Sequence, residues 1–185
     1  MELEEILEHA KTSVERAWGD ARPEPSVTVI GYTDDNEVIY IPLLFRNDEE
    51  KHRSLMMVTA IFACMDVKMY VTIAEAWMSR LSADNIPDIQ PRPSKDPNKI
   101  EVVMLNAVSR NKVLGFTYEI SDDKLLEHPL DDAISFGGRF SELLPPEGLS
   151  IPKEMRDKII KNVMPRIRRE KFKLIKGGKD GETFH

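Results

Sequence analysis

The stretch "VKMYVTIAEAWMSRL", residues 67–81, decides the fold of this chain because it predicts a long central strand. Its β-branched and aromatic residues favour sheet structure, and successive side chains of a strand point to opposite faces. One face of this strand would carry Met69, Val71, Ile73, Glu75 and Trp77. A carboxylate on such an apolar face must be paired, hydrogen-bonded or protonated. Glu75 is therefore the residue on which a functional interpretation depends.

The segments around this strand predict two hairpins. Both are pairs of β-rich runs separated by short turns. The first pair is "SVTVIGYT" (26–33) with "EVIYIPLLF" (37–45), and the second is "IEVVMLNAVS" (100–109) with "KVLGFTYEIS" (112–121). Together with the central strand they predict a mostly antiparallel sheet of about five strands.

Three helices complete the prediction of an α+β fold. Residues 2–18 place apolar side chains at helical spacing, and a helix starting near Asn47 or Asp48 becomes apolar nearly all round over Leu55–Met65. We expect this central helix to be buried against one face of the sheet. A helix from Lys153 to about Lys171 follows Pro152. We expect both terminal helices to cover the other face or an edge.

The domain organisation is predicted to be simple. Residues 121–152 indicate short helical turns between loops, and residues 1–175 form one domain. The glycine-rich, charged end at 176–185 is expected to fray.

Charge is distributed unevenly along the chain. The net charge is −6, but residues 151–185 hold eleven Lys and Arg against five Asp and Glu, and residues 1–150 hold fifteen against twenty-seven. No apolar run reaches the length that crosses a bilayer, and the acidic N-terminus does not resemble a signal peptide. We therefore expect a cytoplasmic protein without a membrane partner. The single cysteine, Cys64, excludes an internal disulfide and is expected to be buried and inert.

Two interpretations of Glu75 remain. It could act as a general acid or base, or as a metal ligand. Alternatively, it is a structural acid that holds the proline-rich loop 82–99, through loop amides or an arginine. The structural interpretation is favoured, with a loop tether formed by Glu75, Trp77, Ser94 and Asp96.

The same segment resembles a group of uncharacterised bacteriophage and prophage proteins. The group shares a Glu-Ala-Trp, a Pro-Ser-x-Asp-Pro and a Glu-Val strand, and the resemblance covers roughly residues 37–120. The matching residues are Glu75, Ala76, Trp77, Pro93, Ser94, Asp96, Pro97, Glu101 and Val102. The resemblance implies no activity, but it implies that Glu75 and the loop act together.

The basic C-terminal region, residues 153–176, is the candidate contact surface. Arrays of Lys and Arg neutralise phosphates or acidic protein surfaces. The candidate residues are Lys161, Arg166, Arg168, Arg169, Lys171 and Lys173. The alternatives are a solvated face that balances the acidic body, or a contact with a second copy of the chain in a homodimer.

Three functional hypotheses follow, in this order. The first is a non-enzymatic accessory protein of a phage or mobile element that binds a host or phage protein, in the host cytoplasm. The second is a nucleic-acid-binding protein that uses residues 153–176. The third is an enzyme with Glu75 as acid or base. The four histidines lack zinc-site spacing, so no metal or cofactor is expected.

Overall fold

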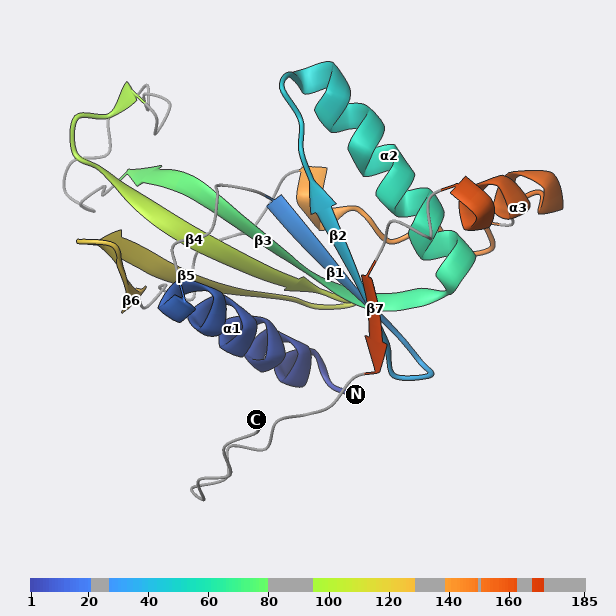
Figure 1. Ribbon diagram of the computed structural model, residues 1–185, viewed down its shortest axis with the longest axis horizontal. Helices are drawn as coiled ribbons and strands as arrows, with labels where there is room; N and C mark the ends of the chain where they lie inside the picture. Colours follow the sequence, from blue (N-terminus) through green and yellow to red (C-terminus); the bar gives the residue numbers. More distant parts are fainter. Residues whose placement is uncertain (21–26, 80–94, 129–138, 150, 163–167, 172–185) are drawn as a thin grey trace.

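A computed structural model describes residues 1–20, 27–79, 95–128, 139–149, 151–162 and 168–171. The chain forms an α+β fold, as predicted, with an antiparallel sheet between helices (Figure 1). The helices are α1 (Leu3–Asp20), α2 (Asp48–Met65), α3 (Lys153–Asn162) and the short 3-10 helix η2 (Arg139–Ser141). The strands are β1 (Val27–Thr33), β2 (Glu37–Leu43), β3 (Val67–Ser79), β4 (Lys99–Val108), β5 (Val113–Ser121), β6 (Lys124–His128) and β7 (Arg168–Lys171).

The sheet has seven strands in the order β6-β5-β4-β3-β1-β2-β7. β3 is the longest strand, lies at the centre, and pairs antiparallel with β1 on one side and β4 on the other. Both expected hairpins, β1–β2 and β4–β5, are present. The stretch at residues 67–79 is therefore the organising strand, because each hairpin attaches to one of its edges.

The sheet contains two strands more than expected, and both lie at its edges. β6 replaces a predicted helical turn, because Asp122 and Asp123 have φ angles of 49° and 59° and reverse the chain in two residues. Positive φ at both central residues is the geometry of a tight hairpin turn. Asn-Gly or Asp-Gly is the usual sequence signal for this turn, and Asp-Asp does not carry it.

β7 corrects the prediction of a helix from Lys153 to about Lys171. α3 ends at Asn162, and residues 168–171 pair antiparallel with β2 instead. Pro165 lacks an N–H and clashes with the preceding turn, so it is incompatible with a continuous helix. The described residues of β7 pair with Glu37 to Tyr40 of β2, and Pro42 of β2 lies opposite Thr28 of β1.

The two faces of the sheet have separate cores. α1 packs against β3, β4 and β5 through residues at helical spacing, among them Ile6, Ala10 and Val14. α2 covers the opposite face through Val58, Ile61 and Phe62. α3 contacts α2 (Figure 1), so of the two terminal helices α1 is the one that covers the face opposite α2.

Both ends of α2 are capped, the first by a side chain and the second by a backbone N–H. The side chain of Asn47 accepts a hydrogen bond of 2.9 Å from the Glu50 N–H, and three acidic residues occupy the first turn. Asp66 ends the helix in the left-handed conformation, with φ 55°. Over Leu55–Met65 the side chains of Met56 and Met57 are exposed and the others are buried or partly buried, so the helix is covered on most sides.

Candidate functional site

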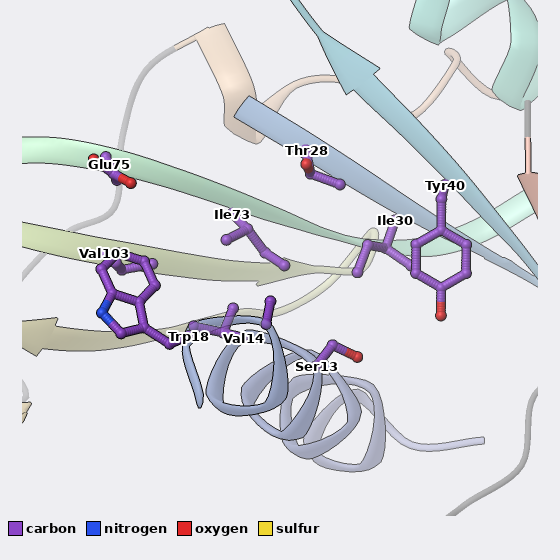
Figure 2. Close-up of a pocket in the computed structure, with 10 residues that line it drawn as sticks. Ser13, Val14, Trp18, Thr28, Ile30, Tyr40, Ile73, Glu75 and Val103 are labelled. Atoms are coloured by element: carbon purple, nitrogen blue, oxygen red, sulfur yellow. The ribbon is translucent and has the colours of Figure 1, made fainter. Parts of the chain in front are cut away.

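Glu75 lies on β3, directly opposite Val103 of β4. It is partly buried and lines a pocket of about 210 Å³ between α1 and the sheet (Figure 2). The expected alternation holds for this strand, because Val71 and Ile73 contact the α1 core on the same face. Glu75 therefore points toward the side of the sheet on which α1 lies.

The pocket has mostly apolar walls, and the polar groups of Glu75 and Tyr40 lie at its two ends. The walls come from α1 and from the strands β1, β2, β3 and β4. The described residues that line it are Ser13, Val14, Ala17, Trp18, Thr28, Ile30, Tyr40, Ile73, Glu75 and Val103. Five of them are aliphatic, two are aromatic, and Glu75 is the one carboxylate among them. In Figure 2, Glu75 and Tyr40 lie at opposite ends.

The position of α1 creates this pocket. α1 packs mainly over β3, β4, β5 and β6, and it reaches β1 through the hydrogen bond of 2.7 Å between His9 Nδ1 and Tyr32 Oη. The α1 face of β1 and β2 carries Thr28, Ile30 and Tyr40, and these side chains form the second wall. The C-terminal turn of α1 is fixed from the other side, because Trp18 Nε1 donates a hydrogen bond of 3.1 Å to the carbonyl oxygen of Asp123 in the β5–β6 turn.

Asp96 is one residue of the predicted loop tether, and the structure places it at the end of the loop that precedes β4. Asp96, with 8% of its surface exposed, accepts a hydrogen bond of 2.8 Å from the Asn98 N–H. That bond, and secondarily the nearby Ser79 hydroxyl, lower the pKa of the Asp96 carboxyl. Asp96 therefore fixes the end of the loop beside the end of β3.

The other members of the tether lie elsewhere. Ser94 is outside the described residues. Trp77 is 46% exposed, and Lys99 Nζ lies 4.4 Å from the centroid of its ring. Trp77 lies opposite Glu101 of β4. Because it is two residues further along β3 than Glu75, its side chain lies on the same face of the sheet. Glu75 itself contributes to the pocket wall, a role that sequence reasoning missed because α1 and the sheet meet only in the folded chain.

The predicted basic contact surface is divided between two elements. Lys161 is exposed on α3, whereas Arg166 and Lys173 lie outside the described residues. Arg168, Arg169 and Lys171 are on β7, in register with Tyr40, Ile39 and Glu37 of β2. These residues are thus part of a sheet edge rather than of one continuous helix.

Helices α2 and α3 present a feature that the sequence analysis missed. Met56 and Met57 of α2 are 61% and 46% exposed, and Met155 of α3 is 53% exposed. Met155 precedes Ile159, which packs against the α2 core, by one helical turn, so both lie on the same side of α3. We use the name methionine surface for these three exposed side chains, two on α2 and one on the neighbouring α3. The sequence did not predict the exposure of Met56 and Met57, because the apolar composition of α2 does not say which side of the helix remains uncovered.

Other candidate chemistry is limited in the described chain. Within the described ranges, no three His, Cys, Asp or Glu side chains are grouped as a metal site would require. Cys64 is buried, and desolvation raises the pKa of its thiol, although Arg156 acts in the opposite direction. No helix in the described part of the chain is long and apolar enough to cross a membrane.

A scan against protein-family models, a search of curated proteins and a search of solved structures each found no match. The fold and the site define the chain as an α+β protein with an antiparallel sheet covered on both faces and a pocket under α1.

Proposed function

We propose that this chain is a non-enzymatic accessory protein that binds a protein partner through the methionine surface. The resemblance to phage proteins supports a partner from the host or from the mobile element itself. The observation that carries the proposal is the exposure of Met56, Met57 and Met155 on two helices that contact each other. Methionine side chains are flexible and polarizable, and they recur at surfaces that adapt to a protein partner.

The surroundings of the methionine surface have the character of an interface rim. Glu49 and Arg53 form an exposed ion pair one turn before the two α2 methionines, and His52 is also exposed there. Apolar side chains bordered by charged ones are typical of protein interfaces. The acidic residues 1–150 favour a partner with a basic surface, since complementary charge accelerates association.

The test replaces all three methionines with glutamine, which has a similar length and helix propensity. The wild-type protein, crosslinked in host lysate, is expected to capture one defined protein, and the triple variant is expected to lose it. The matched control replaces the exposed Leu126 of β6 and Val113 of β5 with Gln and Thr, and should retain the partner. Capture of the same protein by the triple variant overturns the proposal.

The alternative partner at the methionine surface is a second copy of the chain. Light scattering after size exclusion distinguishes a second copy from a different protein. If the wild type is a homodimer and the triple variant is a monomer, the methionine surface binds a second copy of the chain.

A second candidate function is binding of a polyanion at the β7 edge. The observation in its favour is that Arg168, Arg169 and Lys171 are concentrated on one short edge strand. The net charge of −6 opposes it everywhere except at this edge.

A further inference from the structure

We propose that the pocket between α1 and the sheet binds a small organic cation, an aromatic ring that carries a primary amine on a short alkyl chain, with Glu75 as the acceptor for its ammonium group. This inference is independent of the methionine surface, which lies on α2 and α3. The site is composed of residues from five elements, α1, β1, β2, β3 and β4.

The volume limits the size of the ligand. An apolar cavity of about 150 Å³ accommodates one benzene molecule. The pocket of about 210 Å³ therefore fits one aromatic ring with a short side chain. Its entrance is at the surface, because Ala17 of the lining is exposed on α1.

The lining indicates which part of the ligand lies where. Ile30, Ile73 and Val103 form an aliphatic wall suited to a ring. Trp18 and Tyr40 add aromatic groups that can pack against the ring of the ligand. Glu75 lies at one end of this wall, two residues along β3 from Ile73 (Figure 2). An ammonium group at this end would be paired while the ring remains in the apolar part.

The charge of the site favours a cation over an anion. Glu75 is the only charged side chain among the described lining residues. It already has an interaction within the protein. A carboxylate offers about four acceptor positions, so an additional donor can be accommodated. A negatively charged ligand of the same shape would meet a like charge in a partly apolar site.

Three probes with one ring and a short chain test the proposal: 2-phenylethylamine, 2-phenylethanol and 3-phenylpropionate. They are titrated into the full-length protein, and binding is followed by NMR through the methyl groups of Val14, Ile30, Ile73 and Val103 and the indole N–H of Trp18. We expect the amine to shift these signals with an affinity about fivefold higher than the alcohol, as one partly screened ion pair would give. The propionate should bind most weakly.

Two variants separate charge from shape. Glu75→Gln should reduce the affinity for the amine to the affinity for the alcohol. The control is Asp157→Asn, which removes a carboxylate from exposed α3 and should leave both affinities unchanged. Ala17→Leu adds volume at the entrance on an exposed helical position and should weaken all three probes. The proposal is overturned if no probe shifts the pocket signals at millimolar concentration, if the three probes bind equally, or if Glu75→Gln retains the preference for the amine. Because Ala17→Leu leaves Glu75 intact, it tests the location even if Glu75→Gln perturbs folding.

Discussion

Gly31 of β1 lies directly against the ring of Phe62 of α2, so closely that a Cβ atom on Gly31 would lie 2.8 Å from Phe62 Cε1. The same Cβ would lie 3.2 Å from Val67 Cγ2. Phe62 is fully buried and cannot move away without disturbing the α2 core. The contact between α2 and the sheet therefore depends on the absence of a side chain at this position.

Gly31→Ala is expected to destabilise the protein by about 1–3 kcal/mol, the usual cost of overpacking a core. Urea denaturation monitored by circular dichroism measures this change. Gly19→Ala is the matched control. Gly19 lies in α1, where an added Cβ would meet no neighbouring group within 4 Å, so alanine should stabilise by about 0.5–1 kcal/mol through helix propensity. Equal effects of the two substitutions would contradict the close contact.

Tyr70→Phe tests a buried hydroxyl that joins β3 to the segment after η2. Tyr70 Oη donates a hydrogen bond of 2.8 Å to the Phe140 carbonyl and accepts one of 3.2 Å from the Leu143 N–H. Removing it should cost about 1–3 kcal/mol at pH 7, because two buried backbone groups lose a partner. An unchanged urea midpoint at pH 7 would contradict this role.

The same residue predicts a loss of stability in alkali. Burial raises the pKa of Tyr70 to about 12, whereas a tyrosine in the unfolded chain titrates near 10. The stabilisation by neutral Tyr70 is thus complete below about pH 10 and is lost as the pH rises toward 12. Burial also raises the pKa values of Tyr32 and Tyr118, so the wild type should weaken further in alkali. The difference in free energy of unfolding between wild type and Tyr70→Phe should narrow by roughly 1–2 kcal/mol between pH 9.5 and 11.5. A constant difference over this range would contradict a raised pKa of Tyr70.

Asp96→Asn tests the loop anchor at the start of β4. The pKa of Asp96 is lowered in the folded protein, so its ionised form stabilises the fold above the unfolded pKa of about 4, and this stabilisation disappears as the pH falls through the folded value. The difference in thermal midpoint between wild type and Asp96→Asn should be constant above pH 5 and shrink below pH 4. The exposed Asp157→Asn variant serves as control, and a gap that persists to pH 2 would refute the anchor.

Substitution of Arg166, Arg168 and Arg169 by alanine tests the second candidate function. If the β7 edge binds a polyanion, the wild type should bind single- or double-stranded DNA or RNA with an affinity that falls steeply between 50 and 200 mM salt, and the triple variant should lose this binding. Fluorescence anisotropy measures both. Lys124→Ala on the opposite edge strand, β6, is the control. Undiminished binding by the triple variant would assign any affinity to another surface.

Local sequence patterns were enough to predict most of the elements. The alternation in residues 67–79, the two hairpins and the start of α2 near Asn47 or Asp48 depend on neighbours in the chain, and the structure confirms each. The edge strands were missed for identifiable reasons. The turn at Asp122 and Asp123 uses positive φ without glycine, and β7 is stabilised by its pairing with β2 rather than by its own composition.

The candidate site also combines features that local sequence predicts with features that only the fold decides. Sequence alternation placed Glu75 on one face of β3 together with Val71 and Ile73, and the structure shows that α1 packs on this face. Only the tertiary structure decided that Glu75 lines a pocket, because that depends on α1 lying mainly over β3 to β6. It also decided which side of α2 stays uncovered, since the position of α3 is set by packing between distant segments. Periodicity determines which residues share a face, whereas contacts between elements determine what covers that face.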